Sequence, residues 1–331
     1  MKAAVLYFSE KGGKLAQNIA EAIKTEYEVQ VAAPGKELSK VTGELFAEAD
    51  AIIFVGACGI AVRAIAPYVK SKTTDPAVIA ADDMGRHVIS LLSGHIGGAN
   101  RLTEIIAGQI GADPVITTAT DVNKRFSVDE WAAENGFAID SMKAAKDFAA
   151  AILKDNLPVY SEIPADKLHS SLYEGSEGQI GLSVSYTNAK PFEETMLIVP
   201  KRIHLGIGCR RGTSAELIEE FVLKVMAENN LDMRAVCVVS SIDLKSDEEG
   251  LLKFCEMHGV TPRFYTADEL NAAPGEYKPS AFVSSTVGTD NVCERSAVLS
   301  AGPEYKVLVH KTAGGGVTVA AALDIRRLSI E

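Results

Sequence analysis

One stretch of the chain, Asp82 to Glu104, constrains the fold more than any other. Its apolar run Val88 to Leu92 has the length and composition of a buried strand. A glycine-rich segment with the sequence SGHIGGAN follows the run, carries His95, and ends at Asn100, which could cap the helix after it. A strand, a glycine loop and a helix N-terminus together favour a ligand site, because the helix end presents free N–H groups. A tight strand-to-helix turn with a surface histidine explains the same residues equally well.

The composition limits what such a site could bind. The chain has 331 residues, 47% of them apolar and 23% charged, which is ordinary for an α/β protein of two or three domains. A net charge of −11 argues against a nucleic-acid partner. No apolar run approaches the roughly 20 residues that a membrane helix needs. The 5 cysteines are scattered without a Cys-x-x-Cys pair, so we expect reduced thiols in a cytoplasmic protein.

Residues 1–138 predict an α/β domain with a flavodoxin-like or Rossmann-like parallel sheet. Apolar runs at 2–8, 29–33, 51–56 and 75–81 are its expected strands. The turn after the first strand has neither a dinucleotide fingerprint nor a Walker pattern, which disfavours a nucleotide or flavin site there.

Polar and glycine-rich loops follow several of these strands. Gly56 and Gly59 follow the third strand, and a run of hydroxyls that ends in Asp121 follows a later one. Ligands gather at the carboxyl ends of parallel strands, so these loops are candidates for one site. Asp83, at another strand end, could serve acid–base chemistry or only cap a turn.

The rest of the chain divides into two parts. Residues 139–200 predict a small middle region in which the sequence indicates no chemistry. Residues 201–331 predict a second α/β domain with an added hairpin at its end. Its first strand leads into Gly208 to Thr213, a turn whose two arginines favour an anionic ligand other than a dinucleotide. Glu294 opens a later helix, either as part of a capping box or as an acid–base group.

Several segments resemble, in order, the cobalt-precorrin-5A hydrolases, the cobalamin biosynthesis protein G family of the anaerobic vitamin B12 pathway. The segments are 56–63, 74–78, 82–100, 115–121, 206–212 and the helix that begins at Cys293 and Glu294. The resemblance covers nearly the whole chain and is weakest between 140 and 200. It implies an enzyme that opens the δ-lactone of cobalt-precorrin-5A and expels C20 with its methyl group as acetaldehyde, which gives cobalt-precorrin-5B.

This reaction assigns roles to the residues above. Lactone opening needs a base for water and fixed N–H groups for the oxyanion. We predict His95 as the base and the backbone of Gly97 and Gly98 as the oxyanion site. Asp83 would orient the histidine or protonate a leaving oxygen, and Glu294 is the alternative catalytic carboxylate. The predicted contacts to the carboxylate-rich substrate are Gly56, Gly59, Arg63, Gly94, Gly97, Gly98, Asn100, Arg101, Thr117, Thr118, Asp121, Gly208, Arg211 and Gly212.

The resemblance also bears on cofactors and partners. We expect no cofactor or metal ion of the protein's own, because cobalt arrives inside an anionic tetrapyrrole substrate, to which His95 could still be an axial ligand. Hand-over to other enzymes of the pathway is expected, with no membrane and no nucleic acid involved. A non-catalytic carrier of a tetrapyrrole intermediate would use the same loops and arginines. A nucleotide- or flavin-binding enzyme is the second alternative, and the missing fingerprint disfavours it.

Overall fold

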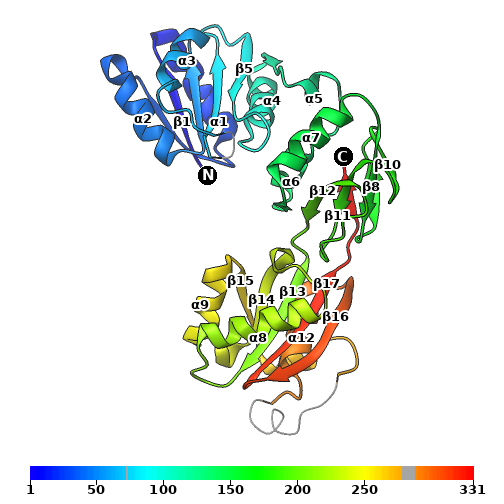
Figure 1. Cartoon of the computed structure of the whole chain (residues 1–331). Helices are drawn as coiled ribbons and strands as arrows, with labels where there is room; N and C mark the ends of the chain where they lie inside the picture. Colours follow the sequence, from blue (N-terminus) through cyan, green and yellow to red (C-terminus); the bar gives the residue numbers. More distant parts are fainter. Residues whose placement is uncertain (72–73, 278–287) are drawn as a thin grey trace. The chain divides into compact units, whose positions relative to one another are not determined.

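The structure, a computed structural model, describes residues 1–71, 74–277 and 288–331. It divides into two compact units, Met1–Glu130 and Trp131–Glu331, and both contain strands and helices (Figure 1). The α/β class predicted from the sequence is confirmed. No helix within the described ranges is long and apolar enough to span a membrane.

The first unit is built on a six-stranded sheet in the order β2-β1-β3-β4-β5-β6. The strands are β1 (Lys2–Tyr7), β2 (Glu28–Ala32), β3 (Ala51–Val55), β4 (Ala77–Ala81), β5 (His87–Leu92) and β6 (Asp113–Val115). The predicted parallel pairing holds for the first four strands, whereas β5 is antiparallel to β4 and β6 is parallel to β5. The reversal follows from chain length, because only residues 82–86 join β4 to β5 and a parallel crossover needs about a dozen.

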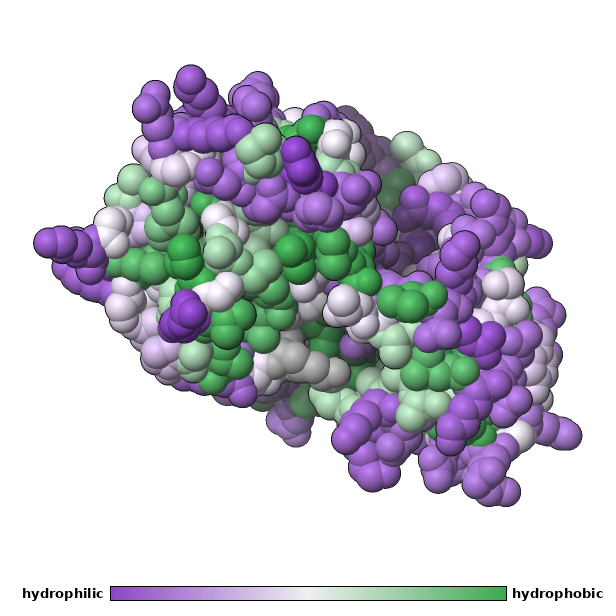
Figure 2. All heavy atoms as spheres, turned by 90° about the horizontal axis from the view of Figure 1, so that it is seen from above, coloured by the Kyte–Doolittle hydropathy of each residue, from purple (hydrophilic) through white to green (hydrophobic). Residues whose placement is uncertain are grey.

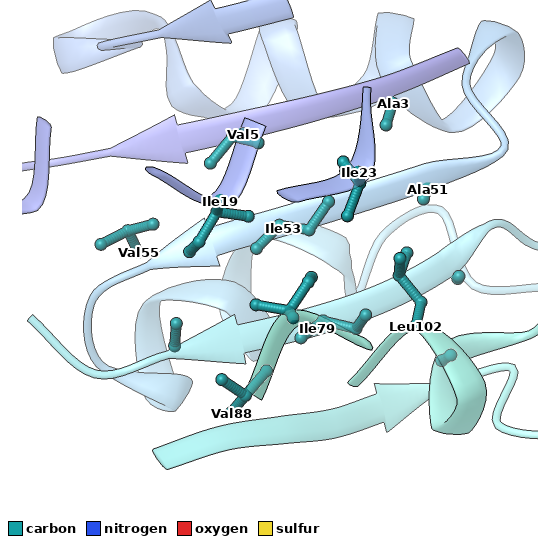
Figure 3. Packing of buried hydrophobic residues seen from close by; sticks show 14 of the residues in the cluster. Ala3, Val5, Ile19, Ile23, Ala51, Ile53, Val55, Ile79, Val88 and Leu102 are labelled. Atoms are coloured by element: carbon teal, nitrogen blue, oxygen red, sulfur yellow. The ribbon is translucent and has the colours of Figure 1, made fainter. Parts of the chain in front are cut away.

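Helices cover both faces of this sheet. They are α1 (Glu10–Ile23), α2 (Leu38–Glu48), α3 (Cys58–Ile65) and α4 (Ala99–Ile110). Two short helices follow them in the chain, α5 (Ala119–Val122) and α6 (Val128–Glu134). Successive residues of a strand point to opposite faces, so Val5 and Ile53 pack with Ile19 of α1 and Leu102 of α4 (Figure 3). Their neighbours in the sequence pack on the other face with α2 and α3. Helix α2 was not predicted from the sequence.

The reversal of β5 separates the loops into two sets. The loops after β1, β3 and β4 lie at one edge of the sheet, and the loops after β5 and β6 lie at the opposite edge. Phe8 and Met84 are exposed in the first set, and Val62 is exposed on α3, the helix after the β3 loop. A broad apolar area is visible among the hydrophilic side chains in Figure 2.

The second unit begins with a five-stranded sheet in the order β10-β8-β11-β12-β7. The strands are β7 (Ala138–Ile139), β8 (Leu157–Ser161), β10 (Leu172–Glu174), β11 (Ile180–Val184) and β12 (Glu194–Val199), with helix α7 (Met142–Ile152) between β7 and β8. All but β7 pair in parallel. The C-terminal strand β18 (Leu328–Ile330) returns here and pairs with β9 (Ala165–Leu168).

A third sheet, in the order β15-β14-β13-β17-β16, completes the second unit. Its strands are β13 (Ile203–Cys209), β14 (Val236–Ile242), β15 (Thr261–Tyr265), β16 (Tyr305–Gly314) and β17 (Val317–Asp324). Its helices are α8 (Ala215–Glu228), α9 (Glu249–His258), α10 (Ala267–Asn271) and α12 (Val292–Ala301). The predicted hairpin is part of this sheet, because β17 pairs antiparallel with β13. Gly206 of β13 lets α12 approach, since a Cβ there would lie 1.8 Å from the carbonyl oxygen of Cys293.

Candidate active site

The loop between β5 and α4 is shaped by its glycines. Gly97 packs against Ser93, and a Cβ at this position would lie 2.3 Å from the Ser93 Cβ and 2.8 Å from the Ser93 carbonyl oxygen. Gly98 has φ of +77°, a left-handed conformation that favours glycine, and it is the N-cap of α4. Its N–H donates to the carbonyl oxygen of His95 at 2.8 Å. Gly98 therefore does not supply the free N–H that we predicted for the oxyanion.

His95 lies between two carboxylates in this loop. Its Nε2 is 3.0 Å from Oδ2 of Asp121, and its Nδ1 is 3.3 Å from Oδ1 of Asp129. The Thr120 hydroxyl is also 3.3 Å from Nε2. The ring is only 13% exposed. Both ring nitrogens are therefore engaged by groups that helix α5 and the first turn of α6 bring to the loop.

The carboxylates favour the protonated histidine. Burial by itself lowers the pKa of His95, but hydrogen bonds to Asp129 and Asp121 and the charge of Glu130 outweigh burial and raise it to about 9. At neutral pH the imidazolium donates from both nitrogens. This state does not fit the predicted role of His95 as a general base, and it fits a general acid.

Asn100 and Thr118 complete the cluster. Asn100 is not the predicted cap but lies in the first turn of α4, where it is only 2% exposed. Its Nδ2 donates to Thr118 Oγ1 and to Asp121 Oδ2, each at 3.1 Å. The Ser90 hydroxyl donates to Asn100 Oδ1 at 2.7 Å. The structure thus brings together four of the predicted site residues, His95, Asn100, Thr118 and Asp121, although Asn100 is too buried to contact a substrate.

Sequence reasoning missed Asp129 and Glu130. The Ser127–Glu130 spacing is that of a capping box, but the Ser127 hydroxyl donates to Oδ1 of Asp129 at 3.1 Å. Glu130 lies with His95 and Asp121, with one ligand atom of each within 4.8 Å of the others. The sequence signal for these residues was two adjacent acids, Asp129 and Glu130, at the start of a helix soon after the hydroxyl run that ends in Asp121.

The cluster also has donors that a metal ion could use. Within the described part of the chain, His95, Asp121 and Glu130 are the group whose spacing would admit a cation. One imidazole and two carboxylates suit several divalent metals. The same three groups form an acid–base set, in which Nε2 is hydrogen-bonded to Asp121.

Asp83 and the first glycine loop lie elsewhere. Asp83 accepts a hydrogen bond of 2.7 Å from the Ser9 hydroxyl, at the end of β1. Gly56 lies at this same edge, and its N–H donates to the carbonyl oxygen of Ala81. The prediction that Asp83 orients His95 is therefore wrong, because β5 is antiparallel to β4 and carries the histidine loop to the opposite edge.

The predicted substrate arginines have partners within the protein. Arg63 donates to the Gly59 carbonyl oxygen at 3.0 Å, Arg101 forms a bidentate pair with Glu26, and Arg211 forms one with Asp247. Gly208 lies in β13, and in the turn after this strand the N–H of Gly212 donates to Oε1 of the buried Glu248 at 2.7 Å. A carboxylate of the protein itself thus accepts a hydrogen bond from the backbone of this turn.

Glu294 is buried and bonded to strand β16. Asn291 caps α12 by accepting from the Glu294 N–H at 3.1 Å, but the Glu294 side chain does not return to the cap. Its Oε1 accepts from the Lys311 N–H at 2.7 Å, and its Oε2 lies 3.5 Å from Nδ1 of His310. Of the three predicted catalytic residues, His95 is the one that lies in a cluster of hydrogen-bonded acid–base groups.

A glycine loop that holds an imidazolium among carboxylates, at the edge of an α/β sheet, is arranged for proton transfer. Residues 40–121 and 203–322 match the family models Cobalamin synthesis G N-terminal and Cobalamin synthesis G C-terminus. The cobalt-precorrin-5A hydrolase of Priestia megaterium is 37% identical over 300 residues, which are 84% of this chain and 80% of that protein. The cobalt-precorrin-5A hydrolase of Salmonella typhimurium is 36% identical over 275 residues, 77% of each chain.

A solved structure is also similar, that of a cobalamin biosynthesis protein G homolog from Sulfolobus solfataricus. It has 23% sequence identity and a TM-score of 0.45, and the match covers 97% of both chains. The two sequence relatives place the protein: the chain belongs to the cobalt-precorrin-5A hydrolase family. The family resemblance seen in the sequence is confirmed.

Proposed function

We propose that this chain hydrolyses cobalt-precorrin-5A in the synthesis of cobalamin, opening its δ-lactone and releasing the two-carbon unit as acetaldehyde to give cobalt-precorrin-5B. The observation that carries this function is the match to cobalt-precorrin-5A hydrolases along most of the chain. The cluster around His95 supports it, because it combines a proton donor with carboxylates that can accept a proton.

The first step is lactone hydrolysis. A carboxylate, which we assign as Asp121, takes a proton from water while the water oxygen bonds to the lactone carbonyl carbon. His95 then gives its proton to the C20 oxygen as the ester C–O bond breaks. The products are an acetate side chain on ring A and a hydroxyl on C20. Asp129, on the other ring nitrogen, holds the imidazolium in place as the buried acid of a triad does.

The second step releases acetaldehyde. The C20 hydroxyl loses its proton to a base, which the histidine neutralised in the first step can supply. The C20–O bond becomes a carbonyl as the bond between C20 and the macrocycle breaks, and the electron pair of that bond enters the conjugated ring. C20 leaves with its methyl group. A single acid–base pair thus serves both steps.

The substrate brings its own cobalt, and we propose that the protein uses no further cofactor. It acts in the cytoplasm on an anionic cobalt tetrapyrrole, and it passes the product to the next enzyme of the pathway. The many carboxylates of the substrate need cationic partners. Arg101 is paired with Glu26 and Arg211 with Asp247. To bind the substrate, either arginine would have to release its protein carboxylate and pair with a carboxylate of the substrate.

Anaerobic incubation with cobalt-precorrin-5A tests this function against the carrier alternative. The hydrolase releases one acetaldehyde for each substrate consumed and continues through many turnovers. A carrier shifts the absorption spectrum of the pigment on binding but releases no acetaldehyde. Spectral binding without acetaldehyde, from a folded wild-type protein, would refute the proposed activity.

A further inference from the structure

Asn100 offers no surface to a substrate and yet bonds directly to the acid–base cluster. Its side chain is 98% buried, and all three of its hydrogen bonds run to other side chains, those of Ser90, Thr118 and Asp121. The Ser90 hydroxyl donates to Oδ1, which fixes the amide orientation and leaves both Nδ2 hydrogens as donors. One of these hydrogens reaches Thr118 and the other reaches Asp121.

Gly94 makes room for this amide. A Cβ at Gly94 would lie 2.8 Å from Oδ1 of Asn100 and 3.1 Å from both its Cγ and its Nδ2. A contact below 3.0 Å cannot be kept, and Asn100 is enclosed on its other sides. The first glycine of the loop is therefore needed for the position of the amide, in addition to the bend of the backbone.

The hydrogen bond from Asn100 determines which oxygen of Asp121 is available. Asn100 Nδ2 and His95 Nε2 both bond to the same oxygen, Oδ2, at 3.1 and 3.0 Å. No donor from the described residues bonds to Oδ1, and the Asp121 side chain is 28% exposed. Two donors on one oxygen fix the rotation of the carboxylate and leave the other oxygen as the acceptor that the cluster does not use.

We propose that Asn100 is a positioning residue for the hydrolysis: it holds the Asp121 carboxylate so that Oδ2 contacts His95 and Oδ1 accepts the proton of the attacking water. This inference rests on the proposed function for the reaction, but the placement of Asp121 can be measured without it. Misplacing a reacting group by about 1 Å can cost about 10²-fold in rate.

The test uses Asn100→Ala, which removes both donor hydrogens and adds no charge. Gly94→Ala is the second variant, because it displaces the amide without deleting it. Asn123→Ala is the matched control, since Asn123 is the exposed C-cap residue of α5 and its Nδ2 donates to the Ala119 carbonyl oxygen at 2.8 Å. Urea unfolding of each variant shows that it is folded.

We expect kcat for acetaldehyde release to fall about 10²-fold in Asn100→Ala, with KM changed less than about twofold. The NMR titration midpoint of the His95 ring should fall in the same variant, because the Asp121 carboxylate is released. Asp129 and Glu130, the other carboxylates that face the ring, stay in place. Asn123→Ala should change neither quantity. A folded Asn100→Ala or Gly94→Ala protein with wild-type kcat and an unchanged midpoint would overturn the inference.

The two readouts separate the proposals. A raised KM at constant kcat would instead make Asn100 a binding residue and would also overturn the positioning role. If the wild type releases no acetaldehyde, the proposed function fails. The NMR midpoint then decides the placement of Asp121 by itself: a lowered midpoint in Asn100→Ala supports it, and an unchanged midpoint refutes it.

Discussion

The His95 ring titrates well above an ordinary histidine, and the size of this shift can be converted into stability. Its pKa is about 9 in place of 6.5, and each unit of pKa corresponds to about 1.4 kcal/mol. The pairing of the protonated ring therefore adds about 3 kcal/mol to the free energy of unfolding. Because the folded-state pKa is raised, this contribution is complete below pH 6.5 and is lost as the pH rises through 9.

Two measurements check this value. NMR titration of the imidazole resonances should place the His95 midpoint near 9, and Asp129→Asn should lower it because one carboxylate partner is lost. Urea unfolding at pH 6 and pH 10 should show a loss of stability that is about 3 kcal/mol smaller in His95→Gln than in the wild type. His87→Gln is the control, since His87 is exposed and is the first residue of β5, at the opposite end of the strand from the His95 loop. A wild-type His95 midpoint near 6.5 would refute the reasoning.

Three further predictions concern the loop and the two units. Gly97→Ala forces its Cβ against Ser93, so we expect acetaldehyde release to fall at least about tenfold and unfolding to become easier by about 1–3 kcal/mol. Burial raises the pKa of Asp324, but hydrogen bonds from two arginines hold it at about 2. This lowered pKa adds about 2 kcal/mol to the free energy of unfolding, which is complete above pH 3.8 and is lost as the pH falls toward 2, so acid unfolding of Asp324→Asn should lack this loss. Phe54→Ala, in the core of the first unit, should cost about 3–5 kcal/mol in urea unfolding.

Local sequence patterns predicted much of the fold. Buried strands such as β3 and β4 are continuous apolar runs, and their length and flanking residues, Gly56 after β3 and Pro76 before β4, were sufficient to place them. Strand direction was harder, because an apolar run has the same composition whichever way it runs. The short connection between β4 and β5 contained the information, since residues 82–86 can form a turn but cannot form a crossover.

The candidate site was predictable only where its residues are close in sequence. His95 and Asn100 belong to one glycine-rich segment of the sequence, and Asp121 ends a hydroxyl run that is visible by itself. Asp129 was missed because its local pattern is that of a helix start, and nothing in the sequence says that this start packs on a histidine 34 residues earlier. Asp83 was assigned to the histidine because the direction of β5 was unknown.

The role of the His95 cluster is tested most directly by the rate of acetaldehyde release from cobalt-precorrin-5A, measured anaerobically in a single turnover. The comparison is between His95→Gln and Asp83→Asn, two variants that change opposite edges of the same sheet. We predict that His95→Gln lowers the rate by at least about 10²-fold, the range for loss of a general acid, and that Asp83→Asn stays within about twofold of the wild type. A folded His95→Gln protein with the wild-type rate, or an Asp83→Asn protein that has lost it, would contradict the account.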